Sequence, residues 1–482
     1  MKVATIDWWK KNQLLSSSSK YKNYLNKIIT KYSGSGNPMT TSVFHSTISF
    51  FNSELPLLEI PYALKDNIST KNIKTCCGSK ILKGYKPPFN ATVVKLLNEK
   101  GASLVFKTHL DELGMGGTGL LSAYGKLFSP WNNKRIVGGS SSGSCFAVTT
   151  GMVPFAIGSD TGDSVRRPAA LNGIIGFKPS WGSVSRYGLF PYAPSLDTIS
   201  WFTNSVTDCK TLLKILNQSD MHDGTKNPDK LKKKQNTKYR IGYDQELFHK
   251  VHNQDMEKKY EIFLKQIKNR KNVELINIQI DKKLLNLAWS IYIVISFTEA
   301  LSSNYNLGGI HFGNQADPSY MENYDELVYE NRKEGFSNTV KSRFGLAALC
   351  LNKENQKQIY IKAKKARKMV QIACENIYKK VDIIIGPASD NVAPFISDDD
   401  LSQLPSLKQD PNWIIDYAVF ANLNGHPSMT LPIGYAKDQD EELPFSIIMD
   451  TAIGNEYLLL NFAQEIEELV QFTHKLQRNN DV

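Results

Sequence analysis

Two turns rich in glycine and serine are the places in this sequence where a nucleophile could be generated. Residues 138–166 read GGSSSGSCFAVTTGMVPFAIGSDTGDSVR, in which the two turns are separated by a predicted helix and a predicted strand. Glycine-rich turns allow backbone N–H groups to point inward, where they can bind a phosphate or an oxyanion. This stretch contains neither a phosphate-loop pattern nor the dinucleotide pattern GxGxxG. It therefore favours an oxyanion cradle beside a serine nucleophile.

A serine nucleophile needs a base, and a lysine is the candidate that this sequence offers. The nearest histidines, His109 and His222, lie in no recognisable motif. Lys65 follows the apolar residues 62–64, so we expect it to enter the interior at the end of a strand. Burial and hydrogen bonding to serines would favour its neutral form, and lowering its pKa from ~10.4 to ~7 costs roughly 4–5 kcal/mol. The alternative for Lys65 alone is a surface lysine at a strand end.

Alternating strand and helix patterns surround these residues and would have to position them. Short apolar runs predict strands, and apolar residues at helical spacing predict helices. Such alternation predicts an α/β fold whose sheet has parallel strands. The strands are expected at 62–65, 103–106, 155–157, 239–243, 381–385, 431–433 and 445–449, and the helices at 21–32, 91–100, 144–150, 362–380 and 455–470.

The composition is that of a folded protein with an excess of positive charge. Of 482 residues, 41% are hydrophobic and 22% are charged, which excludes wholesale disorder. The longest nearly unbroken apolar stretch, 287–297, has 11 residues, so we expect no membrane insertion. The net charge of +11 suits an acidic partner such as tRNA, or a compartment that collects basic proteins. Six cysteines without CxxC or Cys/His spacing predict neither a disulfide scaffold nor a metal site.

We interpret residues 21–475 as a single domain. Both ends of the chain, and the segment 221–240 inside this domain, differ from the rest in composition. Residues 1–20 lie in a basic, serine-rich stretch without Arg, which predicts a targeting or flexible segment; the alternative is an ordinary basic leading helix. Lysines crowd the segment 221–240, so we interpret it as a solvated connector, with a tRNA phosphate contact as the alternative. Residues 476–482 are interpreted as a tail.

Several motifs, in order along the chain, resemble the amidase signature family. They are IPYALKDNI at 60–68, GSK at 78–80, KTHLDELGMG at 107–116, GGSSSGS at 138–144, GSDTGDSVRRPAA at 158–170, FTEALSSNYNLGGIHFG at 297–313 and NLNGHPSMTLP at 422–432. GFKPSWGSVSRYG at 176–188 and SLDTIS at 195–200 are similar in particular to the A subunits of glutamyl-tRNA(Gln) amidotransferases. The resemblance implies the amidase-signature fold, a large mixed central sheet covered by helices on both faces.

The resemblance assigns a Ser–cis-Ser–Lys triad to three residues. Ser164 matches the family's nucleophile, Ser140 matches the bridging serine, whose preceding peptide bond is cis in the family, and Lys65 matches the base. In that chemistry, neutral Lys65 takes a proton from Ser140, Ser140 takes one from Ser164, and Ser164 attacks the carboxamide carbon. The relay then runs in reverse to protonate the departing ammonia.

The family's oxyanion hole uses backbone N–H groups of the turn before the nucleophile, which here are those of Thr161, Gly162, Asp163 and Ser164. This chain departs from the family pattern at Ser142 and Asp163, where the family usually has Gly. A carboxylate ~5 Å from a developing oxyanion would cost about 3 kcal/mol at an effective dielectric constant of 20. We therefore expect the Asp163 side chain to point away from the oxyanion, and activity to survive at a reduced level.

Recognition of free glutamine needs a cation for its α-carboxylate and an anion for its α-ammonium group. The resemblance places Arg367, in AKKARKM, at the carboxylate and Asp416, in WIIDYAVFANL, near the ammonium. It also assigns Gly116 to the substrate pocket. The alternative for Arg367 is a solvated charge on a basic helix. Phe312 stands where related sequences often have a pocket tyrosine, and its alternative is core packing.

The resemblance also implies that this chain is one part of an ATP-consuming complex for protein biosynthesis. A B subunit would activate the γ-carboxyl group of Glu-tRNA(Gln) with ATP and Mg²⁺, bind most of the tRNA and receive ammonia through a tunnel, and a small third subunit would complete a heterotrimer. No cofactor is expected on this chain itself. The Asn/Lys-rich composition, the pI near 9.0 and the basic amino-terminal stretch favour a location in the mitochondrion. The complex would then be of the fungal type, which has the small third subunit. The competing interpretations are a free-standing amidase and a structural subunit with weakened catalysis.

Overall fold

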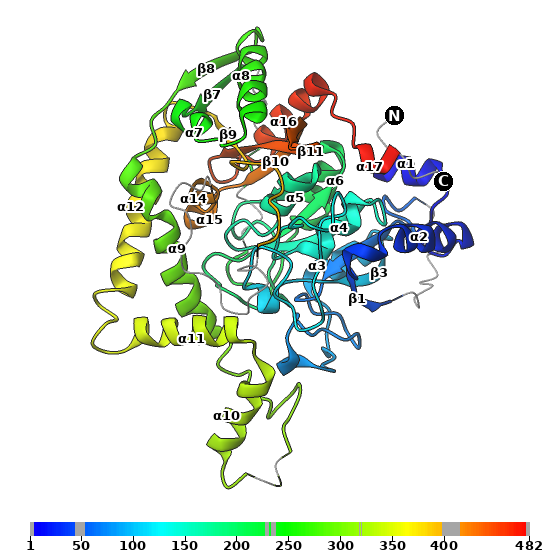
Figure 1. Cartoon of the computed structure of the whole chain (residues 1–482), viewed down its shortest axis with the longest axis vertical. Helices are drawn as coiled ribbons and strands as arrows, with labels where there is room; N and C mark the ends of the chain where they lie inside the picture. Colours follow the sequence, from blue (N-terminus) through cyan, green and yellow to red (C-terminus); the bar gives the residue numbers. More distant parts are fainter. Residues whose placement is uncertain are drawn as a thin grey trace.

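The fold is built on a mixed β-sheet, which Figure 1 shows among the surrounding helices. The computed structural model describes residues 4–43, 54–226, 231–232, 238–317, 319, 321–397 and 415–478. Within these residues, 11 strands form one sheet in the order β1-β3-β2-β4-β6-β5-β10-β11-β9-β7-β8. They span Met39–Ser42 (β1), Pro61–Lys65 (β2), Ser103–Thr108 (β3), Phe155–Asp160 (β4), Ile175–Lys178 (β5), Thr198–Thr203 (β6), Tyr239–Tyr243 (β7), Val273–Asn277 (β8), Ile383–Pro387 (β9), Ser428–Asp438 (β10) and Glu441–Thr451 (β11).

The predicted parallel pairing holds for part of this sheet only. β2 is parallel to β3 and β4, and β7 is parallel to β8 and β9. The pairs β4–β6, β5–β6, β5–β10, β10–β11 and β9–β11 are antiparallel. Only Gln439 and Asp440 join β10 to β11, whereas parallel neighbours need a crossover of roughly a dozen residues or more. The large mixed sheet implied by the family resemblance is therefore confirmed.

Helices cover both faces of the sheet. They span Ile6–Lys11 (α1), Ser19–Lys31 (α2), Thr92–Glu99 (α3), Ser142–Thr149 (α4), Arg166–Asn172 (α5), Val206–Leu216 (α6), Gln245–His249 (α7), Gln254–Lys268 (α8), Lys282–Ser303 (α9), Tyr324–Gly335 (α10), Asn338–Leu351 (α11), Tyr360–Tyr378 (α12), Ile415–Ala418 (α14), Phe420–Asn424 (α15), Glu456–Val470 (α16) and Lys475–Arg478 (α17). In β9, Ile383 and Ile385 pack in one apolar core and Ile384 packs in another, because successive side chains of a strand point to opposite faces. The first core contains residues of α2, α3, α6, α8 and α16, and the second contains residues of α9, α11, α12 and α15.

β2 and β4 are the neighbouring strands that lead into the predicted catalytic turns. β2 coincides with the predicted strand apart from its first residue, whereas β4 extends three residues further than the apolar run predicts. Gly158, Ser159 and Asp160 continue β4 because they pair with residues 198–200 of β6. All six residues of β4 are buried, so polar side chains at its end are held inside the protein.

Among the described residues, α9 is the one helix that is long and apolar enough to cross a membrane by length and composition. It has 22 residues, because helical residues flank the predicted apolar stretch on both sides. In the structure it packs against α11, α12 and α14, and its side chains Ile291, Ile295 and Ala300 are buried. The absence of membrane insertion stays a prediction.

The amino-terminal segment and the basic connector are described in part. In α1, Trp9 is fully buried, and the backbone N–H of Ile6 donates to Asp208 at 3.2 Å. In the connector, Asp223 forms an ion pair with Arg186 at 3.6 Å. Residues 227–230 and 233–237, which carry three of its six lysines, lie outside the described residues. The roles of both segments and the domain boundaries stay predictions.

Candidate active site

Lys65 is the last residue of β2 and is fully buried. Its Nζ atom lies 2.8 Å from Oγ of Ser140 and 2.9 Å from Oγ of Ser159. The Ser159 hydroxyl is held in turn by the side-chain amide of Asn67, at 3.1 Å. The lysine therefore lies inside the protein between two serine hydroxyls, and the alternative of a surface lysine is wrong.

Burial lowers the pKa of Lys65 to about 7, because a charged ammonium group loses its hydration inside the protein. Three buried carboxylates oppose this shift without reversing it, namely those of Asp111, Asp160 and Asp197. The neutral amine, which can accept a proton, is thus well populated at neutral pH. A lysine with this pKa, next to a serine hydroxyl, can act as a general base.

Ser140 lies in the turn that precedes α4, and the peptide bond between Gly139 and Ser140 is cis. Glycine is required at the two preceding positions. Gly138 has φ of +85°, and a Cβ atom there would lie 2.9 Å from Cα of Pro168. A Cβ atom on Gly139 would lie 2.3 Å from a carboxylate oxygen of Asp111. Close packing around both glycines therefore holds the Ser140 turn in place.

The carboxylate of Asp111 organises the loop that carries Gly116. It accepts backbone hydrogen bonds from Thr118, Gly119 and Leu121 at 3.0–3.2 Å. A Cβ atom on Gly116 would lie 2.4 Å from the Asp111 side chain, so the backbone at Gly116 runs directly over this carboxylate. The loop reaches the Ser140 turn, since the backbone N–H of Gly139 donates to the carbonyl of Gly117 at 2.9 Å.

Ser164 lies in the loop between β4 and α5 and is buried. Its carbonyl accepts a hydrogen bond from the backbone N–H of Ser141 at 3.2 Å, which joins this loop to the Ser140 turn. The structure thus brings the three predicted residues to adjoining elements, with Lys65 and Ser140 in side-chain contact and Ser164 attached through the backbone. Their catalytic roles stay predictions.

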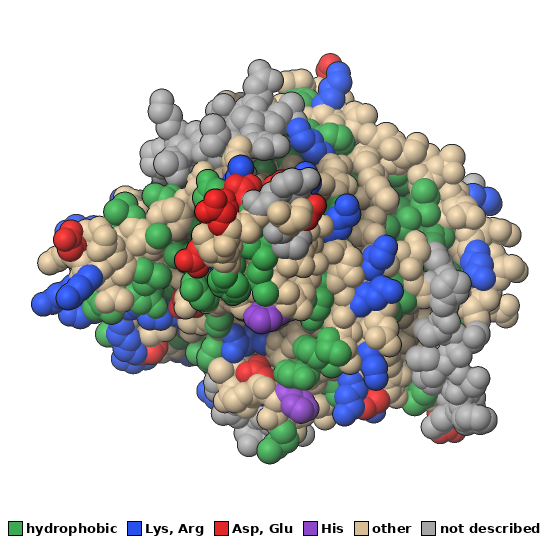
Figure 2. All heavy atoms as spheres, turned by 90° about the horizontal axis from the view of Figure 1, so that it is seen from below, with side chains coloured by type: hydrophobic (Ala, Val, Ile, Leu, Met, Phe, Trp, Pro, Cys, Tyr) green, Lys and Arg blue, Asp and Glu red, His purple; other side chains and the backbone are tan. Residues whose placement is uncertain are grey.

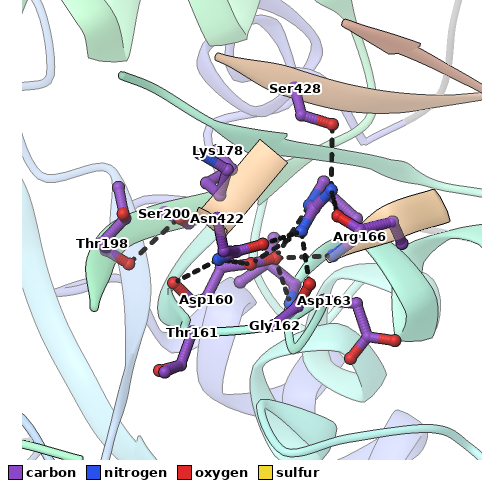
Figure 3. A network of polar contacts seen from close by, with 12 residues as sticks. Asp160, Thr161, Gly162, Asp163, Arg166, Lys178, Thr198, Ser200, Asn422 and Ser428 are labelled. Carbon is purple, nitrogen blue, oxygen red and sulfur yellow. Dashed lines mark hydrogen bonds and ion pairs between the residues drawn. The ribbon is translucent and has the colours of Figure 1, made fainter. Parts of the chain in front are cut away.

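A buried ion pair fixes the shape of the Ser164 loop (Figure 3). Arg166 donates to both carboxylate oxygens of Asp160, at 3.0 and 3.1 Å, and to the carbonyl of Gly162 at 2.7 Å. Its remaining acceptors are the side chain of Asn422, the carbonyl of Ala418 and the hydroxyl of Ser428. Burial raises the pKa of Asp160, but the charge and hydrogen bonds of Arg166 outweigh it and hold this pKa at about 2.

The predicted oxyanion residues lie in this same loop. Within the described residues, the backbone N–H groups of Gly162, Asp163 and Ser164 donate no hydrogen bond to another protein group, so these donors can meet an oxyanion. A Cβ atom on Gly162 would lie 2.8 Å from the ring of Tyr292 in α9, which leaves room only for glycine. Thr161 is held differently, because its hydroxyl donates to Asp197 at 2.7 Å.

Asp163 points away from the Asp160–Arg166 pair, as Figure 3 shows. Its carboxylate lies 2.5 Å from both Nε and Nη2 of Arg167, which belongs to the first turn of α5. Burial raises the pKa of Asp163, while the positive charge of Arg167 opposes that rise. The side chain therefore turns toward Arg167, and its expected orientation away from the oxyanion stays a prediction.

Of the predicted substrate residues, Arg367 and Asp416 lie on helices α12 and α14, whereas Gly116 and Phe312 lie in loops. Arg367 of α12 donates to the carbonyl of Leu423 at 2.7 Å, and to the hydroxyl and carbonyl of Ser195 at 2.7 and 2.9 Å. It is therefore not a freely solvated charge. Phe312 packs against the ring of Tyr85, with centroids 5.1 Å apart. Asp416 belongs to α14, but its side chain lies outside the described part of the chain.

Several residues of this site were not singled out by the sequence analysis. They are Asp160, Arg166, Arg167, Asp197 and Asn422. Asp160 and Arg166 lie inside the GSDTGDSVRR motif, so an acidic and a basic residue on either side of the nucleophile were the available signal. Asp197 and Asn422 also lie inside family motifs, SLDTIS and NLNGHPSMTLP, but those motifs do not indicate the distant residues that they contact.

No metal centre is visible in the part of the chain that the structure describes, where no three His, Cys, Asp or Glu side chains gather in a way that could hold an ion. The surface charge is also dispersed on the face drawn in Figure 2, where Lys and Arg side chains lie among apolar, acidic and uncharged ones. A tRNA contact by this chain and the expected lack of a cofactor stay predictions.

Comparison with known proteins gives one consistent family. The amidase family profile matches residues 45–460. The chain is 37% identical over 444 residues to the A subunit of the glutamyl-tRNA(Gln) amidotransferase of Mycoplasma genitalium, covering 90% of this chain and 91% of that protein. It is 38% identical over 431 residues to the protein of the same name from Mycoplasma pneumoniae, covering 88% of each.

Solved structures agree with these relatives. The crystal structure of the glutamyl-tRNA(Gln) amidotransferase A subunit from Thermotoga maritima superposes with a TM-score of 0.74 at 28% identity, covering 93% of this chain and 91% of that one. The allophanate hydrolase of Kluyveromyces lactis superposes with a TM-score of 0.76 at 23% identity, covering 97% of this chain and 72% of that one. The second likeness concerns the fold alone.

Proposed function

This chain belongs to the amidase family, and on that premise we propose that it is the glutamine-hydrolysing subunit of a glutamyl-tRNA(Gln) amidotransferase. The observation that carries the proposal is the contact between a buried lysine of lowered pKa and a serine, Lys65 and Ser140, beside the loop of Ser164. The relatives that match most of the chain at 37–38% identity support the choice of the amidotransferase among amidases.

The proposed reaction begins with proton transfer through the two serines. Neutral Lys65 accepts the proton of Ser140, Ser140 accepts that of Ser164, and Ser164 Oγ forms a bond to the carboxamide carbon of glutamine. Backbone N–H groups of the loop 161–164 stabilise the oxyanion, and one such donor contributes about 3–4 kcal/mol in the transition state. The relay then returns the proton to the leaving ammonia, and water cleaves the γ-glutamyl ester to give glutamate.

Substrate recognition is proposed to use Arg367 for the α-carboxylate of glutamine and Asp416 for its α-ammonium group, with Gly116 lining the pocket. A guanidinium group suits a carboxylate because its N–H donors form a planar fork. The packing of Arg367 against Ser195 supports a fixed orientation for this fork. A fixed donor loses little conformational freedom when it binds.

The ammonia is proposed to pass to a B subunit, which uses ATP and Mg²⁺ to activate Glu-tRNA(Gln) and convert it to Gln-tRNA(Gln). A mitochondrial location and a small third subunit complete the proposal; the +11 net charge and basic amino-terminal stretch support both a tRNA-bound complex and an organelle. Two other functions remain as outcomes of the test, a free-standing amidase and a structural subunit.

The test compares the native complex with a complex that contains Ser164→Ala. Glutamine-dependent formation of Gln-tRNA(Gln) should be lost in the variant, while formation from added ammonium chloride should be retained, because the partner's reaction needs only ammonia. Equal rates from saturating glutamine would defeat the mechanism. Ammonia release from unrelated amides without any partner would favour a free-standing amidase, and no release under any condition would favour a structural subunit.

A further inference from the structure

An acidic residue stands inside the loop that would bind the oxyanion. Asp163 directly precedes Ser164, and its side chain is only 8% exposed. A buried carboxylate at this place repels a developing negative charge unless a cation compensates it. The loop therefore needs a partner for Asp163 that keeps the carboxylate neutralised and directed away from the N–H donors.

The neighbouring arginine attracts Asp163 only through its charge. Arg166 is fully buried and directs the hydrogen bonds of its guanidinium group to Asp160, Gly162, Asn422 and other acceptors. Figure 3 shows the Asp163 carboxylate outside this cluster.

Arg167 supplies the missing charge. Its Nε and Nη2 atoms both lie 2.5 Å from Oδ2 of Asp163, and its backbone N–H donates to the carbonyl of Asp163 at 2.8 Å. The Arg167 side chain is 15% exposed, so solvent screens this pair less than a surface pair. The side chain and the backbone N–H of Arg167, in the first turn of α5, therefore both bind Asp163.

The same guanidinium group also lies against the loop of Gly116. A Cβ atom on Gly117 would lie 3.5 Å from Nη1 of Arg167. The carbonyl of Gly117 accepts the hydrogen bond from Gly139, the residue before Ser140. Arg167 therefore lies between the nucleophile loop and the loop that supports the bridging serine.

We propose that Arg167 is a positioning residue for the amide-hydrolysing site, which neutralises Asp163 and keeps its carboxylate away from the oxyanion donors. The proposal deepens the proposed function and rests on it for the identity of the substrate. The two residues then act as one unit, because the native rate with an acidic residue at 163 requires an arginine at 167.

A double-mutant cycle in the complete complex tests this unit. Arg167→Met should lower kcat for glutamine by about tenfold or more, with KM changed less than about twofold, because a lost charge in the transition state acts on the chemical step. Asp163→Gly should raise kcat by about two- to fivefold, because the carboxylate is gone. The double variant should return to within about threefold of the native rate, which a merely structural loss would not do.

Independent effects would overturn the proposal: a double variant as slow as Arg167→Met, or slower, means that Arg167 does not act through Asp163. Arg167→Lys keeps the charge without the fork and should lie between the native protein and Arg167→Met. If Arg167→Met does not fold, as judged by circular dichroism, the cycle is run with Arg167→Lys and Arg167→Gln.

A second measurement separates this proposal from the identity of the substrate. The rate at which a sulfonyl fluoride modifies Ser164 depends on the nucleophile and its loop and needs no recognition of glutamine. The variants should rank in this modification rate as they do in kcat, with Arg167→Met slowest and Asp163→Gly fastest, even if glutamine is not the substrate. If the native protein hydrolyses no glutamine but the order is kept, the proposed function fails and the Asp163–Arg167 unit stands; if the order is absent, the unit fails.

Discussion

Nζ of Lys65 lies 2.8 Å from Oγ of Ser140 at a place where the lysine side chain has no contact with solvent. An ammonium group there could only donate to the hydroxyl, whereas the neutral amine can accept its proton. Because burial holds the pKa of Lys65 at about 7, both forms exist near neutral pH. The protonation state of this one side chain therefore controls the first step of the proposed relay.

Glutamine hydrolysis should rise with pH through about 7 and level off above it. The cation, which cannot accept a proton, dominates below the Lys65 pKa of about 7, and the neutral base dominates above it. On the acid side, kcat/KM should fall about tenfold per pH unit. A pH profile of ammonia release checks this, and a flat profile or an inflection near the ordinary lysine pKa would contradict it.

Replacing the base should stabilise the protein while abolishing hydrolysis. The pKa of Lys65 is about 7 in the folded chain and ~10.4 in the unfolded chain, so the folded state is penalised below pH ~7 and relieved as pH rises toward 10. Lys65→Met should raise the free energy of unfolding at pH 7 by about 2–3 kcal/mol, even after the loss of the three hydrogen bonds that Lys65 makes. Urea unfolding at neutral and alkaline pH measures this, and the gain should shrink at the higher pH. A variant less stable than the native protein at both values would refute the buried-base assignment.

Arg166→Met should destabilise the fold by about 3–5 kcal/mol, because Asp160 would remain as a buried charge without its partner. Urea unfolding gives this quantity directly. Asp160→Asn combined with Arg166→Met removes both charges, and we expect the pair of changes to recover part of the loss. Equal destabilisation by the single and double changes would mean that the ion pair is not the cause.

The hydrogen bond from the hydroxyl of Thr161 to the carboxylate of Asp197 should support catalysis, and removing either partner should remove the same contribution. Thr161→Val and Asp197→Asn each disturb the 2.7 Å hydrogen bond that tethers the oxyanion loop, so each should lower kcat by about three- to tenfold. The combined variant should be no slower than the slower single one. Steady-state rates with glutamine decide this, and fully additive losses would show that the two residues act separately.

Arg367→Lys should raise KM for glutamine by about tenfold, because a lysine cannot supply the planar fork that suits a carboxylate. Lys365→Ala, an exposed position on the same helix, is the matched control and should leave KM unchanged. An unchanged KM in Arg367→Lys would remove Arg367 from the substrate site and leave it as a structural contact to Ser195.

The local part of this site could be predicted because neighbours in the chain determine it. Lys65, Ser140 and Ser164 each lie in a short motif of consecutive residues, so the resemblance to the amidase signature family could assign each of them. The strand at 239–243 was predicted with its observed bounds from its own residues. The pairing direction of the strands could not be obtained in this way, because it depends on how distant segments meet.

The contacts that support the site also depend on how distant segments of the chain meet. Arg166 reaches Asn422 across 256 residues, and Arg367 reaches Ser195 across 172, with no local pattern that announces either pair. The Asp163–Arg167 pair is different, since its spacing of four residues at a helix start is visible in the sequence. The family pattern draws attention to Asp163 as a replacement of glycine, but it does not indicate that Arg167 is its partner.

The dependence of Arg166 on Ala418, Asn422 and Ser428 has a consequence for how the protein is made. A ribosome-bound chain that has emerged only through Ser164 already carries all three predicted catalytic side chains, yet its nucleophile loop has no scaffold. We expect nascent or truncated chains to be inert toward glutamine until α14, α15 and β10 have been translated and have docked. On this expectation, ammonia production would begin only when the polypeptide is nearly complete.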